Sequence, residues 1–145
     1  MLPVNFRSFR KKLSFYRQAY RKFLSRTEKN PPKGIDKLTP IIDKEVWEEV
    51  DCLSCANCCK VMTPTFTEKD IIRISAHFEQ TPAEFKKQWL KKSNKEFVNK
   101  SQPCQFLNLT DNKCSIYEIR PVDCAGFPHL TKRPWADYAH VHKQT

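Results

Sequence analysis

Several common features are scarce or missing in this chain of 145 residues, and each absence argues against a class of function. Only two residues are glycine, and there is no Gly-rich phosphate loop, nucleophile elbow or H-E-x-x-H motif. No run approaches the roughly eighteen apolar residues that a membrane-spanning helix needs. The sequence therefore predicts no transmembrane segment. It favours a binding protein over an enzyme and leaves open whether any reaction is catalysed.

The N-terminus also lacks the apolar segment of a secretory signal, because Arg and Lys interrupt every apolar stretch. We therefore expect a cytoplasmic protein in a reducing compartment. Clustered thiols there are metal ligands or catalytic groups more often than disulfide partners. Residues 1–27 are rich in Arg and free of acids, which is also typical of a mitochondrial transit peptide, and this is the alternative.

Acidic residues are concentrated outside the N-terminal quarter. Residues 1–37 hold eleven Lys or Arg against two acids, a net charge of +9, whereas residues 38–145 hold fifteen against fourteen, a net charge of +1. The sequence therefore predicts a basic amphipathic helical arm with a Pro-rich linker over residues 1–37. A cysteine-bearing, nearly neutral metal-binding domain is predicted over residues 38–145.

The arm has the periodicity of an α-helix that ends at the Pro-Pro segment, residues 29–34. Its apolar residues follow one another at spacings of three or four: Phe6, Phe9, Leu13, Tyr16, Tyr20 and Phe23. This stripe either packs against the rest of the protein while the charges are solvated, or forms a surface for a partner. Nucleic acid, an anionic membrane surface and an acidic protein are the candidate partners.

Three more helices are expected before residue 93. One has Pro40 near its first turn, with Ile42, Val46 and Trp47 facing inward. Two others begin at capping boxes, Thr-Glu-Lys-Asp at 67–70 and Thr-Pro-Ala-Glu at 81–84, and the second runs to about residue 92. The predicted core-facing residues of these two are Ile71, Ile72, Ile74, Phe78, Phe85, Trp89 and Leu90.

Residues 105–109 and 114–119 are typical of two strands, joined by a turn at Asp111 and Asn112. The expected fold is therefore α+β and mostly helical. It is a small metal-stabilised domain with a short β-hairpin, preceded by the N-terminal amphipathic helix.

Four cysteines lie within eight positions: Cys52, Cys55, Cys58 and Cys59. Thiolates bind zinc, iron–sulfur clusters and copper(I), and two intervening residues let a turn direct two sulfurs at one ion. Adjacent side chains point in different directions, so Cys59 is expected to serve a second ion, bridge two ions or remain unbound. Asn57 tolerates positive φ and suits a tight turn around the metal.

Three more cysteines, Cys104, Cys114 and Cys124, are spaced ten positions apart around the predicted hairpin. Each is either a buried apolar side chain or a remote ligand that the hairpin brings to the cluster. Among the histidines, His129 is a candidate additional ligand, whereas His77 is expected to be structural or solvated. His140 and His142 are expected to be exposed.

The cysteine cluster and the segments that follow it together resemble the YkgJ-type cysteine-cluster family. These are bacterial proteins described as carrying a C-x2-C-x2-C-C zinc- or iron-chelating domain. The likeness covers about residues 47–130 and includes the segments at 52–59, 66–78, 103–107, 114–124 and 126–129. It implies one metal-binding set: Cys52, Cys55, Cys58, Cys59, Cys104, Cys114 and Cys124. It also implies that Arg120 and Pro121 are motif residues beside the metal.

Two departures from the family pattern stand out. Asn57 occupies a position that is often Gly. Related chains also tend to continue into a further Cys-Pro and a helix. If that segment supplies an eighth ligand, this chain is truncated and its site is incomplete; the sequence leaves this open.

Zinc is the first candidate, because a closed thiolate site stabilises a small fold. The alternative is iron, including a [4Fe–4S] cluster in a protein that transfers electrons or assists a modifying enzyme. Dithiol chemistry at Cys58 and Cys59 is a third candidate, without the βαβ context of a thioredoxin.

Overall fold

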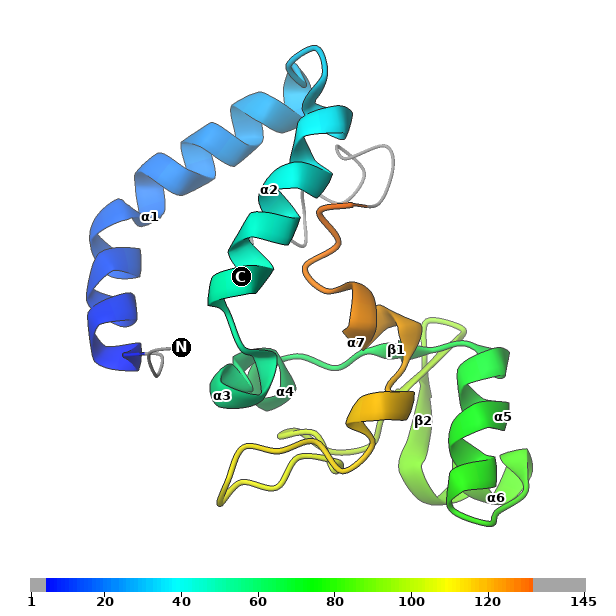
Figure 1. The fold of residues 1–145 in the computed structure, drawn as a ribbon. Helices are drawn as coiled ribbons and strands as arrows, with labels where there is room; N and C mark the ends of the chain where they lie inside the picture. The colour runs from blue at the N-terminus through cyan, green and yellow to red at the C-terminus, as the bar shows by residue number, and fades with distance from the viewer. Residues whose placement is uncertain (1–4, 132–145) are drawn as a thin grey trace. The chain divides into compact units, whose positions relative to one another are not determined.

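The computed structural model describes residues 5–131, and the chain divides into two compact units. One unit contains residues 1–51 and 128–145, and the other contains residues 52–127. The expected α+β, mostly helical fold is confirmed (Figure 1). No helix in the described part of the chain is long and apolar enough to cross a bilayer. His140 and His142 lie outside the described residues.

The described residues of the first unit form two helices, α1 (Phe6–Lys29) and α2 (Ile35–Glu49). The predicted N-terminal helix is thus confirmed, and its first turn is capped by the Asn5 side chain, which accepts a hydrogen bond from the backbone N–H of Ser8 at 3.0 Å. Gly34 precedes α2 with a φ of +82°, a left-handed conformation that glycine adopts without strain. The linker between the two helices therefore ends at Gly34, the residue type best suited to this left-handed turn.

Two expectations for α2 are wrong. The helix begins at Ile35, so Pro40 lies inside it and not in its first turn. The side chains of Ile42, Val46 and Trp47, expected to face inward, are 43%, 48% and 39% exposed, and no residue of α2 is buried. Helical periodicity identifies the apolar face of a helix but does not show that another element covers it.

The second unit consists of short elements joined by long loops. Its helices are α3 (Cys52–Cys55), α4 (Asn57–Val61), α5 (Glu68–His77), α6 (Pro82–Trp89), the 3-10 helix η1 (Tyr117–Ile119) and α7 (Val122–Gly126). Both predicted capping boxes are present. Thr67 and Thr81 each accept a hydrogen bond from the backbone N–H three residues later. The carboxylates of Asp70 and Glu84 in turn accept one from the backbone N–H of the threonine.

A three-stranded antiparallel sheet lies beside these helices, in the order β1 (Thr65–Phe66), β3 (Glu96–Asn99), β2 (Leu90–Ser93). Asn94 and Lys95 join β2 to β3 with φ values of +48° and +72°, as a tight two-residue hairpin requires. The helix expected to reach residue 92 therefore ends at Trp89, because the chain enters β2 there.

The hairpin predicted over residues 105–119 is present only next to its turn. One antiparallel bridge pairs Leu107 with Cys114, with a backbone hydrogen bond on either side of it, and η1 replaces the end of the second predicted strand. The predicted turn is confirmed. Asn112 has a φ of +59°, and the Asp111 carboxylate accepts a hydrogen bond from the backbone N–H of Lys113 at 3.0 Å.

The core of this unit is rich in aromatic side chains. Its buried members are Phe66, Ile71, Ile74, Phe85, Leu90, Phe106 and Ile116. The rings of Phe85 and Phe106 stack with their centroids 6.3 Å apart. Ile72, expected in the core, is 58% exposed because it lies on the outer face of α5. Cys104 and Cys114 pack against the core, so its aromatic layer supports the residues that carry these thiols.

Candidate metal centre

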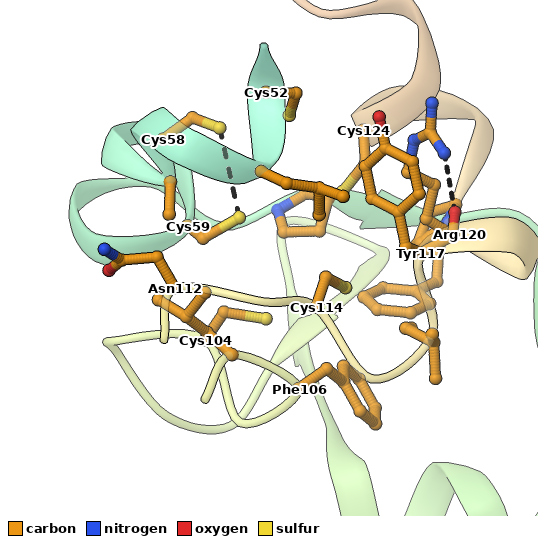
Figure 2. A pocket seen from close by; sticks show the side chains of 17 residues that line it. Cys52, Cys58, Cys59, Cys104, Phe106, Asn112, Cys114, Tyr117, Arg120 and Cys124 are labelled. Carbon is orange, nitrogen blue, oxygen red and sulfur yellow. Dashed lines mark hydrogen bonds between the residues drawn. The ribbon is translucent and has the colours of Figure 1, made fainter. Parts of the chain in front are cut away.

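A small cavity in the second unit brings together most of the cysteines. Its volume is about 50 Å³, enough for a few water-sized species and too little for a bulky organic substrate. Six of the seven cysteines line it (Figure 2): Cys52, Cys58, Cys59, Cys104, Cys114 and Cys124. They come from three segments that are distant in sequence: α3–α4, the loop before η1, and α7. Cys55 is not among the lining residues.

Helix α4 presents two adjacent thiols to the cavity, Cys58 and Cys59. Ala56 joins α3 to α4 with a φ of +49°, so the left-handed turn falls at Ala56 and not at Asn57, which begins α4. The sulfurs of Cys58 and Cys59 lie 4.0 Å apart. The expectation that these adjacent side chains diverge is therefore wrong.

The loop that carries Cys104 is joined to α4 through the main chain. The backbone N–H of Cys104 donates to the carbonyl of Cys59 at 2.8 Å. Arg120 and Pro121, expected beside the metal, both line the cavity. The Arg120 guanidinium lies over the ring of Tyr117, 3.9 Å from its centroid.

Two carboxylates hold α7, and therefore Cys124, in place. Asp70 is fully buried at the start of α5, and its carboxylate accepts hydrogen bonds from the backbone N–H of Val122 at 3.1 Å and from Arg73 at 2.6 Å. Asp123 accepts a hydrogen bond from the backbone N–H of Thr65 in β1 at 3.0 Å. Sequence reasoning identified Asp70 only as part of a capping box and missed this second role.

Asn99, at the end of β3, was also missed by sequence reasoning. It is 2% exposed, and its side-chain N–H donates to the sulfur of Cys104 at 3.2 Å. Its carbonyl oxygen accepts a hydrogen bond from Gln105, which also donates to the Trp89 carbonyl. Asparagine is common in loops, so nothing in the sequence alone distinguishes this one.

The two adjacent thiols differ in acidity. The hydrogen bond from Cys59 lowers the pKa of Cys58 to about 7, against the opposing effect of burial. The same hydrogen bond raises the pKa of Cys59, and burial adds to this increase. Cys58 is therefore the thiol of the pair that more readily becomes a thiolate, the form that binds metals.

The more distant thiols are held in their neutral form. Burial raises the pKa of Cys104, Cys114 and Cys124, and neighbouring thiols add to the increase. The positive charge of Arg120 partly offsets this effect at Cys114. A bound cation would favour the thiolate form of these cysteines over the thiol form. Metal binding would therefore release protons.

The cysteines fit a metal that prefers sulfur ligands. Within residues 5–131 no disulfide joins them. Four sulfurs at about 2.3 Å from a tetrahedral zinc ion would lie about 3.8 Å from one another. The Cys58–Cys59 separation of 4.0 Å is close to that value. Over the same residues, however, no three Cys, His, Asp or Glu side chains are already grouped closely enough to hold an ion. A site with three or four sulfur ligands would therefore require the remaining thiols to move inward.

His77 and His129 belong to different units of the chain. His77, at the end of α5, is exposed and contacts the Phe78 ring edge-on at 5.4 Å, in agreement with a structural or solvated role. His129 belongs to the other unit. Its role as an additional ligand stays a prediction.

Comparison with known proteins identifies a family whose model matches this chain. Residues 51–141 match the family model described as "CxxCxxCC: Putative zinc- or iron-chelating domain". The chain is also 31% identical over 81 residues to the uncharacterized protein MJ0661 of Methanocaldococcus jannaschii. That match covers 54% of this chain and 43% of the relative, so the chain spans less than half of the relative's length. No solved structure matches the chain.

Proposed function

This chain belongs to the CxxCxxCC family, and we propose that its second unit holds a zinc or iron ion through cysteine thiolates that line the cavity. The observation that carries this proposal is the convergence of six thiols from three distant segments on one small space. Packing alone does not account for such a set, because thiols used as small apolar groups need not share a cavity. The family's description as zinc- or iron-chelating supports the same function.

Cys58 and Cys59 form the proposed starting point of the site, because their sulfurs already have nearly the spacing of two ligands of one ion. The other ligands come from Cys52, Cys104, Cys114 and Cys124, which line the same cavity. Cys55 belongs to the set that the family resemblance implies, and it lies on the adjoining helix α3.

The surrounding residues hold these thiols near one another. The hydrogen bond between Cys104 and the Cys59 carbonyl fixes the loop to α4, and Asp70 fixes α7 to α5. A bound zinc ion would cross-link the segments without redox chemistry, whereas iron would add electron transfer.

The proposal is tested by comparing a cysteine that lines the cavity with a histidine outside it, after purification without air. We expect Cys58→Ser to lower the bound zinc or iron, measured by elemental analysis, by at least about tenfold. His77→Ala is the control, because His77 is exposed and outside the cavity lining, and it should keep the metal. Full metal content in Cys58→Ser would contradict the proposal.

The same samples identify the metal. Zinc gives a colourless protein, whereas a [4Fe–4S] cluster gives a brown protein with equal amounts of iron and acid-labile sulfide. Wild-type protein that contains neither metal, even after incubation with each under reducing conditions, would refute the metal-binding function.

A further inference from the structure

Helix α1 exposes aromatic side chains along one face. Tyr16, Tyr20 and Phe23 follow one another at spacings of four and three, and they are 45%, 51% and 64% exposed. The rings of Tyr16 and Tyr20 also contact each other, with centroids 5.8 Å apart. We call these three residues the α1 aromatic face. Exposed aromatic side chains gathered on one face mark an interaction surface more often than isolated ones do.

Positive charge surrounds this face. Helix α1 contains nine Lys or Arg residues and one acid, Glu28. At 100° per residue, Arg17 and Arg21 lie along one edge of the α1 aromatic face, and Lys12 and Arg26 lie along the other. All four basic residues are exposed. Both edges of the face can therefore approach an anionic surface at the same time.

We propose that α1 lies flat in the interface of an anionic lipid membrane. The α1 aromatic face enters the boundary between headgroups and acyl chains, while Arg and Lys contact the lipid phosphates. This arrangement requires a helix with a charged face, low overall hydrophobicity and aromatic or aliphatic residues on the other face. It does not require a membrane-spanning segment, and α1 is not one.

The position of the aromatic residues favours lipid over nucleic acid. A nucleic-acid duplex would meet the basic face, with its phosphates on Arg and Lys, and would leave most of the α1 aromatic face in water. The bases of a single strand stack on aromatic rings, so the vesicle test includes a single-stranded RNA. A membrane satisfies both groups, because its anionic phosphates lie directly above its apolar layer.

The test measures co-sedimentation of the full chain with vesicles. We expect binding to vesicles of phosphatidylcholine and phosphatidylglycerol in equal amounts, and binding at least about tenfold weaker to phosphatidylcholine alone. Raising the salt concentration from about 0.1 to 0.5 M should weaken the binding without abolishing it, because salt screens charges but not apolar contacts.

Two single substitutions on α1 measure how much the aromatic residues contribute to vesicle binding, separately from the charges. Phe23→Ala should weaken vesicle binding about fivefold, because it removes apolar area from the α1 aromatic face. Gln18→Ala is the control. Gln18 is exposed and lies about 160° around the helix from both Tyr16 and Tyr20, so binding should change by less than about twofold. Alanine favours helix, so both variants should keep α1, which circular dichroism checks.

A charge-reversal pair gives a second and independent measurement. Arg17→Glu combined with Arg21→Glu should reduce the preference for anionic vesicles by at least about tenfold while leaving the metal content of the protein unchanged. The proposal is overturned by equal effects of Phe23→Ala and Gln18→Ala, or by binding to single-stranded polyuridine without binding to anionic vesicles.

Discussion

Helices α1 and α5 have equally clear amphipathic patterns, yet their apolar faces have different surroundings. Ile71 and Ile74 on α5 are fully buried, whereas Tyr16 and Phe23 on α1 are 45% and 64% exposed. In the second unit several short elements face one another around one aromatic cluster. A core therefore depends on how many elements converge, and periodicity within a single helix does not predict that number.

The same difference separates two kinds of binding surface. The cysteines of the second unit are partly buried and lie beside a packed core, which suits an ion that must be enclosed. The charges and rings of α1 are exposed, which suits a broad partner that the helix meets from outside. Substitutions of the same kind should therefore have different consequences in the two regions.

The largest expected effect compares two phenylalanines. Phe85 is fully buried at the centre of the aromatic cluster, so Phe85→Ala should lower the free energy of unfolding of the second unit by about 3–5 kcal/mol. Phe23→Ala, at a side chain 64% exposed, should change it by less than about 0.5 kcal/mol. Urea unfolding followed by tryptophan fluorescence measures both. Similar losses would mean that α1 is part of the same cooperative core.

The next largest effect is expected when the metal is removed. If ligands of the second unit bind an ion, a free concentration one thousand times the Kd stabilises that unit by about 4 kcal/mol. Chelation should therefore speed hydrogen exchange in α5 and α6 while leaving exchange in α1 unchanged. Equal acceleration in α1 and α5 would show that the ion stabilises both regions. No change in either would argue against a structural ion.

A smaller effect is expected from the buried carboxylate that joins α5 to α7. Burial would raise the pKa of Asp70, but hydrogen bonds from Thr67, Arg73 and Val122 outweigh it and hold the pKa below its usual value of 3.8. A lowered pKa stabilises the fold at higher pH. This stabilisation is lost as the pH falls below 3.8 through the folded-state value.

Asp70→Asn should therefore cost about 2–3 kcal/mol near neutral pH and flatten the loss of stability in acid. Glu84→Gln is the matched control, because Glu84 has the same place in the capping box of α6 but is exposed. Its loss should be clearly smaller. Denaturant unfolding across the acid range measures both variants, and equal losses would refute a special role for the α5–α7 connection.

The parts of the fold that sequence reasoning predicted correctly have local signals. The capping boxes at Thr67 and Thr81 and the turn at Asn112 each depend on residues within three positions. The sheet was missed because β1 has two residues and β2 begins directly after a helix, without the alternation of a half-buried strand. Its hairpin turn contains Asn94, but Lys95 occupies the position where glycine would have made the signal clear.

The candidate site was predictable in composition but not in geometry. Crowding of the cysteines at 52–59 indicated metal binding from sequence, and the family match agrees with it. The sequence did not show that Cys58 and Cys59 approach each other while Cys55 lies outside the cavity lining. That difference depends on the left-handed backbone of Ala56, a residue type that carries no signal for such a turn.

The smallest expected effect concerns Asn99, whose N–H···S hydrogen bond reaches Cys104. Such bonds stabilise negative charge on sulfur, and outer hydrogen bonds of this kind typically alter metal affinity by about 10- to 100-fold when removed. Asn99→Leu should weaken metal binding by about tenfold. It should also shift the sulfur-to-cobalt charge-transfer band of the Co²⁺-loaded protein to lower energy, because the thiolate loses a donor.

Gln105→Leu is the control for that substitution. It removes the hydrogen bond that orients Asn99 but leaves the donor to Cys104 in place, so the charge-transfer band should stay near its wild-type energy. If the substitutions acted only by lowering the stability of the fold, the charge-transfer band would change in the same way in both variants. A band that shifts equally in both, or in neither, would mean that Asn99 supports the fold without influencing the sulfur of Cys104.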